Sequence, residues 1–249
     1  MILLVDNSNT RTKFMLLPGE GIEEGELRII PTADLTSENI LDVVKEHTLT
    51  GAVVASVVPR TANLLKEVLQ VLCPVCLLHA QTAGLPIKYD YPGVATLGAD
   101  RVANIVAVSQ YYPLPCVAVD AGTAITFDVV VPATDHKTCY VGGAIAPGMN
   151  TMLASLNQQT SLLPHIQMDS PAPSIGKNTC EAIQSGVHWG VCGLVERVLQ
   201  QIEVALGSKP YVVVTGGDAE KIASSVSKID AVDELLTFRG LQRVANLCL

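Results

Sequence analysis

Two aspartates, Asp6 and Asp120, each end an apolar run and stand directly before a short turn of small residues. The first copy reads ILLVD-NSNTRT-KFMLL over 2–17, and the second reads CVAVD-AGTA-ITFDVVV over 116–131. A strand that ends in a carboxylate and then turns tightly exposes backbone N–H groups beside a negative side chain. Such a turn can hold a phosphate through its N–H groups and a metal ion through its carboxylate. The two copies together indicate a duplicated fold that handles phosphate.

Plain turn chemistry is the alternative interpretation, because Asp, Asn, Ser and Gly are common turn residues. A threonine, Thr10 or Thr123, follows each aspartate at a similar offset, and each copy opens one half of the chain. This repetition favours the nucleotide interpretation over two unrelated turns.

Other glycine segments do not complete a known phosphate motif. Gly176-Lys-Asn-Thr179 resembles the end of a P-loop, but Pro171 stands at the first glycine position and Asn178 at the Ser/Thr position. The Rossmann glycine fingerprint and the nucleophile elbow are also absent. Gly216 and Gly217 precede an expected helix, where they would either admit a nucleotide close to the backbone or form a tight turn.

Apolar periodicity predicts the elements that position these turns. Strands are expected over 1–6, 12–17, 26–30, 51–57 and 75–78 in the first half, with helices over 36–47, from residue 59 and over 100–111. Strands over 115–120, 123–131, 138–146, 210–215 and 231–236 are expected in the second half, with helices from about residue 150 and over 178–206, 217–227 and 239–247. Both halves follow the order βββαβαβα, which predicts an α/β fold with domains 1–113 and 114–249 whose mixed sheets face a cleft.

Composition limits the class of protein. The 249 residues are 49% hydrophobic and 16% charged, which is typical of a well-packed soluble protein, and the net charge of −8 argues against a nucleic-acid partner. Apolar runs are strand-sized and the N-terminus has no basic stretch, so no membrane partner and a cytoplasmic location are expected. The seven cysteines are predicted to be reduced thiols, and only Cys73 and Cys76 have the spacing of a metal or redox pair.

Short motifs along nearly the whole chain resemble those of the type III pantothenate kinases, which belong to the acetate-kinase, sugar-kinase, Hsp70 and actin-like superfamily. The motifs are DNSNTR at 6–11, SVVP at 56–59, IKYDYP at 87–92, LGADR at 97–101, DAGTA at 120–124, GGAIAPG at 142–148, GKNT at 176–179, EAIQSG at 181–186 and TGG at 215–217. The resemblance implies a duplicated ribonuclease H-like fold, as in actin-like ATPases. It also implies transfer of the γ-phosphoryl group of ATP to the 4′-hydroxyl of pantothenate, the first step of coenzyme A synthesis.

The resemblance further implies roles for individual residues. Asp100 corresponds to the family's proton acceptor, Asp6 is expected near Mg²⁺, and Asp120 is expected to bind a monovalent cation, potassium or ammonium. ATP and its phosphates are expected at Asp6, Asn7, Ser8, Asn9, Thr10, Arg11, Thr12, Lys13 and Thr123. Pantothenate is expected at Tyr89, Gly98, Ala99, Asp100, Arg101 and Thr179, with its carboxylate at the Arg101 guanidinium.

Three of these residues also have ordinary structural interpretations. Asp100 could stabilise the first turn of a helix, Arg101 could pair with a surface carboxylate, and Thr179 could cap a helix or lie in its first turn. In the family the threonine is contributed across a dimer interface, so the resemblance implies a homodimer with two shared sites.

The chain departs from the family pattern in two places. Ser8 replaces the usual glycine of the first turn, which bears on how closely a phosphate can approach the backbone. The loop between Pro92 and Gly98 is longer than usual, so Tyr89 aligns by its Tyr-x-x-Pro context whereas Tyr91 is nearer by counting back from Gly98. Tyr89 is the predicted substrate contact.

Two other functions are compatible with the same motifs. One is a catalytically silent relative that acts as a regulatory or accessory protein, and the joint presence of Asp6, Asp100, Arg101 and Asp120 argues against it. The other is an enzyme of the same superfamily that phosphorylates a different small acceptor or hydrolyses a phosphoanhydride.

Overall fold

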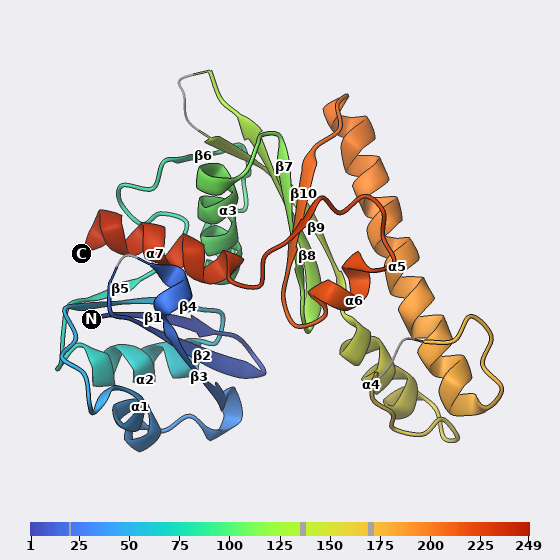
Figure 1. Cartoon of the computed structure of the whole chain (residues 1–249), viewed down its shortest axis with the longest axis horizontal. Helices are drawn as coiled ribbons and strands as arrows, with labels where there is room; N and C mark the ends of the chain where they lie inside the picture. Colours follow the sequence, from blue (N-terminus) through green and yellow to red (C-terminus); the bar gives the residue numbers. More distant parts are fainter. Residues whose placement is uncertain (20, 135–137, 169–171) are drawn as a thin grey trace. The chain divides into compact units, whose positions relative to one another are not determined.

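The computed structural model describes residues 1–19, 21–134, 138–168 and 172–249 (Figure 1). It contains two compact units, one of Met1–Pro113, Val130–Val141 and Leu235–Leu249 and one of Leu114–Val129 and Gly142–Glu234. The chain first changes unit at the predicted boundary near residue 113. Two later segments return to the first unit, so the assignment of all of 114–249 to one domain stays a prediction.

A five-stranded sheet lies at the centre of the first unit. Its strands lie in the order β3-β2-β1-β4-β5, with bounds β1 Ile2–Asn7, β2 Arg11–Leu17, β3 Glu26–Pro31, β4 Gly51–Ser56 and β5 Val75–Leu77. β2 runs antiparallel to β1 and β3, whereas β4 runs parallel to β1 and β5. The β1–β2 register places Asp6 opposite Lys13, so the first predicted phosphate turn is the tip of a hairpin.

Helices cover both faces of this sheet (Figure 1). α1 (Ser37–Val44) and α2 (Pro59–Leu69) share a core with β1, β2 and β4 that contains Leu3, Phe14, Ile40 and Leu65. α1 begins with a capping box at Thr36, and α2 begins with proline at its first position, where no N–H partner is needed. α3 (Ala99–Tyr111) and α7 (Leu236–Cys248) pack on the other face, against β1 and β4.

The crossing of α3 and α7 is unusually close at Gly240. A Cβ atom placed on Gly240 would lie 1.9 Å from the carbonyl oxygen of Ala103, so only glycine allows the two backbones to approach this far. Beside the crossing, Thr237 donates a buried hydrogen bond of 2.9 Å to the side-chain oxygen of Asn104. This contact fixes α3, whose first turn carries Asp100 and Arg101.

The second sheet repeats the strand order of the first. Its order is β11-β10-β7-β8-β9-β6, with bounds β6 Ile87–Tyr89, β7 Cys116–Ala121, β8 Ala124–Pro132, β9 Thr138–Pro147, β10 Tyr211–Thr215 and β11 Ala231–Val232. α4 (Met149–Gln159), α5 (Thr179–Leu206) and α6 (Ala219–Ala223) share its core with Val119, Phe127 and Val214. Read in reverse and without β6, this order is β9-β8-β7-β10-β11, which corresponds strand for strand to β3-β2-β1-β4-β5 of the first sheet. The correspondence confirms the predicted duplicated α/β fold.

Three segments differ from the sequence-based prediction. β11 ends at Val232 rather than 236: the Asp233 N–H makes the last ladder bond to the Val214 carbonyl, and Leu236 is already buried at the start of α7. α6 covers 219–223 instead of 217–227. β6 was not predicted, since three residues with one paired edge carry no periodic signal.

Within the described residues, three short 3-10 helices lie at Ile22–Glu24, Thr32–Asp34 and Val94–Thr96. Across the described ranges, no helix has both the length and the apolar composition that a membrane span requires.

The Gly240→Ala variant is expected to lose about 1 to 3 kcal/mol of unfolding free energy, because the added methyl group overlaps the Ala103 carbonyl. Gly190→Ala is the matched control, since its added Cβ would lie in open space within α5 and alanine favours helix by up to about 1 kcal/mol. Urea denaturation of both variants measures the difference. Wild-type stability in Gly240→Ala would contradict the close crossing.

Candidate active site

The turn after β1 brings a carboxylate and an ammonium group together. Asp6 is 5% exposed, and its Oδ2 lies 3.4 Å from Lys13 Nζ, whose side chain is one third exposed. Ser8 Oγ donates to Asp6 Oδ1 at 3.1 Å, and Ser8 N donates to the Arg11 carbonyl at 3.1 Å. Ser8 therefore closes the turn and orients the carboxylate. Lys13 remains accessible enough for its ammonium group to reach a phosphate.

Asn7 and Thr12 point into the unit rather than out of the turn. Asn7 Oδ1 accepts hydrogen bonds of 2.6 Å from both Ser56 and Thr61, and Asn7 Nδ2 donates to Thr12 Oγ1 at 2.7 Å. Thr12 is paired in turn with Thr32, which donates to the Ser8 carbonyl at 2.7 Å. These buried side chains hold the turn in place, whereas the predicted contacts Asn9, Thr10 and Arg11 are exposed at its rim.

Asp100 lies in the first turn of α3, and its position depends on Gly98. The Asp100 Oδ1 atom accepts a hydrogen bond of 2.7 Å from the backbone N–H of Arg101. A Cβ atom on Gly98 would lie 2.6 Å from the same oxygen, so any side chain at this position would displace the carboxylate. Ala99 is buried and anchors the turn. Gly98, Ala99 and Arg101, which flank Asp100 in the predicted site, thus fix its carboxylate.

Burial raises the pKa of the Asp100 carboxyl above its ordinary value, because the charged form is poorly solvated there. The hydrogen bond from the Arg101 N–H acts in the opposite direction, and the negative charge of Asp6 raises the pKa further. Asp6 and Asp100 are therefore near enough to interact electrostatically. A carboxylate with a raised pKa takes a proton more readily, which is the property a general base needs.

Arg101 is held by a tyrosine that the sequence did not single out. Its Nη2 donates to the Tyr140 hydroxyl at 2.8 Å, and Tyr140 is fully buried. The rings of Tyr89 and Tyr91 both lie edge-on to Tyr140, with centroids 6.2 and 5.3 Å away. Both candidates for the substrate tyrosine therefore belong to one aromatic cluster beside Arg101.

The second Asp turn lies in the second unit, where three segments converge. Asp120 ends β7, and a Cβ on Gly216 would lie 2.6 Å from Asp120 Oδ1 and 2.5 Å from the Ala121 carbonyl oxygen. Gly216 has φ +96°, a conformation that favours glycine. Gly148 N and Thr151 Oγ1 donate to the carbonyl of Thr123 at 3.0 and 2.6 Å. The TGG and APG motifs thus shape the turn that carries Asp120 and Thr123.

Metal binding at these turns would need ligands from elsewhere. In the part of the chain that the structure describes, no group of three or more His, Cys, Asp or Glu side chains is arranged to hold a metal ion. A single carboxylate such as Asp6 suits Mg²⁺ only when phosphate oxygens and water supply the remaining ligands. The geometry fits a metal that arrives with a nucleotide.

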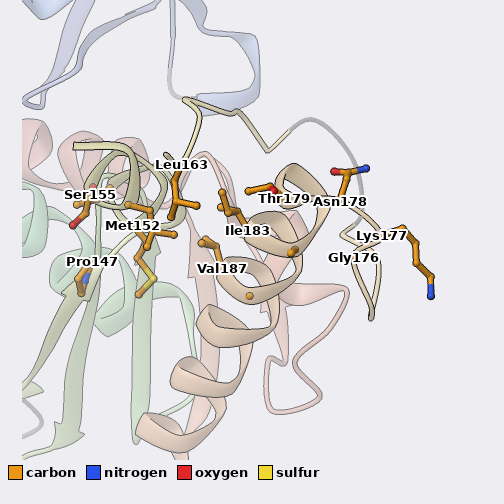
Figure 2. A pocket seen from close by; sticks show the side chains of 14 residues that line it. Pro147, Met152, Ser155, Leu163, Gly176, Lys177, Asn178, Thr179, Ile183 and Val187 are labelled. Carbon is orange, nitrogen blue, oxygen red and sulfur yellow. The ribbon is translucent and has the colours of Figure 1, made fainter. Parts of the chain in front are cut away.

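Thr179 is the first residue of α5 and lies at the rim of an apolar cavity of about 990 Å³ (Figure 2). Met152 and Leu163 line one side of the cavity, and Ile183 and Val187 of α5 line the other. Asn178 is the helix cap, since its side chain accepts from Glu181 N at 3.0 Å, whereas Lys177 points away from the cavity. The GKNT segment therefore starts a helix, and Thr179 is free of the capping role.

Some site residues left no signal in the sequence. Tyr140 lies in a strand pattern, and only the β6–β9 register shows that it is opposite Tyr89. Ser56 and Thr61 could have been suspected from the SVVP segment and the start of α2, yet their common partner Asn7 lies about fifty residues earlier in the chain. Such long-range hydrogen bonds have no local periodicity.

Sequence comparison identifies relatives over nearly the full length. A family model described as type III pantothenate kinase matches residues 2–201. A type III pantothenate kinase of Akkermansia muciniphila is 44% identical and covers 98% of both chains. A second one, of Methylacidiphilum infernorum, is 37% identical and covers 99% of this chain and 88% of its own.

Solved structures share the fold at lower identity. A protein described as a Baf family transcriptional activator from Campylobacter jejuni has a TM-score of 0.55 at 20% identity, covering 98% of this chain and 97% of its own. A glucokinase from an Antarctic psychrotroph has a TM-score of 0.53 at 13% identity, covering 99% and 98%. The archaeal actin homologue Ta0583 has a TM-score of 0.51 at 11% identity, covering 98% of both chains. These likenesses establish the actin-like fold and nothing further.

Proposed function

The chain belongs to the type III pantothenate kinase family and phosphorylates pantothenate with ATP, and from this premise we propose which residues carry the reaction. Asp100 is the general base that takes the proton of the 4′-hydroxyl as its oxygen attacks the γ-phosphorus. The observation that carries this proposal is the partly buried carboxylate of Asp100, whose pKa is raised by desolvation and for which Gly98 leaves room. The alternative helix-stabilising role is compatible with it, because Asp100 accepts the Arg101 N–H while keeping a second oxygen.

Asp6 and Lys13 act on the phosphates of ATP. The Lys13 ammonium group lies at the exposed end of the pair and can offset negative charge on the leaving phosphate. Asp6 would hold the Mg²⁺ that accompanies ATP, and this ion would supply charge neutralisation. The exposed residues Asn9, Thr10 and Arg11 are proposed as direct contacts, with Ser8 contributing through the turn that it closes. Asn7 and Thr12 stabilise that turn through their buried hydrogen bond.

Asp120 and Thr123 form the second nucleotide-facing turn. Asp120 is half-buried at the end of β7, and its carboxylate oxygens are ligands suited to potassium or ammonium. Thr123 is exposed, so its side chain can contact the nucleotide while its carbonyl is held by Gly148 and Thr151. A cation at Asp120 would reduce the repulsion between this carboxylate and the phosphates.

Pantothenate is recognised at both ends. Its hydroxyl lies at Asp100, beside Gly98 and Ala99, and its carboxylate lies at the guanidinium of Arg101, whose fork suits a carboxylate. The Tyr89 hydroxyl is buried and has no hydrogen-bond partner among the described residues, so a substrate oxygen would satisfy it. This supports Tyr89 over Tyr91 as the substrate contact.

A homodimer would complete the site through Thr179. Leu162 and Ile175, which are next in sequence to the cavity-lining residues Leu163 and Gly176, are 91% and 71% exposed. Exposed apolar side chains beside an apolar cavity are typical of a protein interface. We therefore propose that a second copy covers this face and that Thr179 of one subunit contacts pantothenate in the site of the other.

The cysteines favour a reducing compartment for this enzyme. All seven are free thiols, and four of them are buried. We propose a cytoplasmic location on this ground. The regulatory alternative has no support, since the likeness to the Baf family protein establishes the fold alone.

The proposed function is tested by a coupled ADP-release assay with pantothenate, ATP and Mg²⁺ in potassium chloride. ADP release should require pantothenate, and replacing potassium with sodium should reduce the rate sharply because of the cation at Asp120. The Asp120→Asn variant should lose most of this difference between the salts. Equal rates in both salts would rule out the proposed cation site at Asp120. ADP release without pantothenate would point to another acceptor or to hydrolysis of ATP.

The Asp100→Asn variant should lower kcat by about 10² to 10⁴, because asparagine cannot take the proton. The free energy of unfolding of the same variant should instead be higher than that of the wild type at pH 7. A carboxyl whose folded-state pKa is raised destabilises the fold once it ionises, and the cost grows as pH rises from 3.8 through the raised pKa. Asparagine removes this cost while its amide oxygen can still accept the Arg101 N–H.

Thermal unfolding at several pH values measures that second effect. The Tm of Asp100→Asn should exceed that of the wild type at pH 7, and the gap should narrow as the pH is lowered toward 3.8. A turnover equal to that of the wild type would eliminate Asp100 as the base. If the Tm of Asp100→Asn at pH 7 were lower than that of the wild type, burying the charged Asp100 carboxylate would not destabilise the fold.

Mixing two impaired variants tests the shared site. Asp100→Asn and Thr179→Val should each be impaired alone, yet a mixed dimer has one site with both native side chains. Equal co-expression with two affinity tags should restore about a quarter of wild-type activity, since half of the dimers are mixed and each has one intact site. Activity that only averages the two variants would show that Thr179 acts within its own subunit or not at all.

A further inference from the structure

Tyr140 is a buried phenol whose hydroxyl contacts a cation of the site. Its ring is 0% exposed, and its hydroxyl accepts a hydrogen bond of 2.8 Å from Arg101 Nη2. A phenol is uncharged at neutral pH, so this bond orients the guanidinium without neutralising it. A carboxylate in the same place would instead form an ion pair and compete with an anionic ligand.

Strand β6 holds the Tyr140 ring in place. The parallel register sets Tyr89 opposite Tyr140, and Asp90 N donates to the Tyr140 carbonyl at 2.9 Å. The rings of Tyr89 and Tyr91 contact Tyr140 at interplanar angles of 69° and 71°, the edge-to-face arrangement that aromatic pairs prefer. With the backbone and both neighbouring rings fixed, the Tyr140 hydroxyl has one position, and Arg101 Nη2 must meet it there.

We infer that Tyr140 is a positioning residue that sets the plane of the Arg101 guanidinium for the carboxylate of pantothenate. The inference rests on the proposed role of Arg101. Arg101 has five N–H donors in a rigid planar fork. A hydrogen bond from one of them to Tyr140 fixes the plane of the guanidinium in which a carboxylate must bind. Loss of this bond would widen the range of guanidinium orientations, and narrowing that range again when the ligand binds would cost entropy.

The effect of such an anchor is confined to ligands that carry the carboxylate. Tyr89 belongs to the same cluster, and burial raises its pKa to about 12, so its hydroxyl stays a neutral donor at neutral pH. Pantothenol, which has a hydroxymethyl group in place of the carboxylate, offers the guanidinium no negative charge. The preference for pantothenate over pantothenol therefore reports on the orientation of Arg101.

Steady-state kinetics of Tyr140→Phe, Arg101→Gln and the double variant test the inference. Tyr140→Phe should raise KM for pantothenate by about 5- to 10-fold, with a smaller effect on kcat and none on KM for ATP. Its preference for pantothenate over pantothenol should fall by a similar factor. Tyr111→Phe is the matched control, because Tyr111 is an exposed tyrosine at the end of α3, the helix that carries Arg101.

The double variant separates positioning from general structural damage. In the Arg101→Gln background, Tyr140→Phe should have no further effect on KM or on the preference, since the group that it positions is gone. Equal additional losses in both backgrounds, or an unchanged preference in Tyr140→Phe, would overturn the inference. Wild-type kinetics in Arg101→Gln would instead overturn the proposed role of Arg101 itself. A circular dichroism melt of each variant identifies any that has failed to fold.

Discussion

Burial of a single carboxylate, that of Asp100, is the constraint on which the proposed site depends. Water would stabilise its charge but would also lower its tendency to take a proton, so the protein removes water and replaces only part of the lost solvation. Backbone N–H groups, that of Arg101 first among them, supply that part together with the positive charge of Arg101, and the absent side chain of Gly98 leaves the space. The close crossing of α3 and α7 holds the helix on which this balance is built.

The residues of the first turn divide into two groups that a motif does not distinguish. Asn7 and Thr12 are as much part of the DNSNTR segment as Asn9 and Thr10, yet their side chains form a buried network with Ser56. A buried amide with all its groups paired is rigid, because breaking one bond leaves an unsatisfied partner. The inward group supplies rigidity, and the outward group is left to meet the phosphates.

The sequence predicted most of the fold, because long elements with clear apolar periodicity, such as α5 and the β1–β2 hairpin, carry their own signal. It also located the two Asp turns and, through the resemblance, Asp100 and Arg101. It could not locate Tyr140 or strand β6, since their pairing depends on a register between segments fifty residues apart. The end of β11 was misplaced because Leu235 and Leu236, which extend the apolar pattern of the strand, are the cap and the first residue of α7.

The last helix has a consequence for how the chain is made. α7 packs on β1 and β4, and a Cβ on Gly51 would meet Leu249, so the first unit is completed by residues that follow the whole second unit in the sequence. During synthesis the part of β1 and β4 that α7 covers stays exposed until the residues of the second unit have been made. The first unit therefore cannot complete its core before the second unit has been synthesised, and the folding of the two is coupled in time.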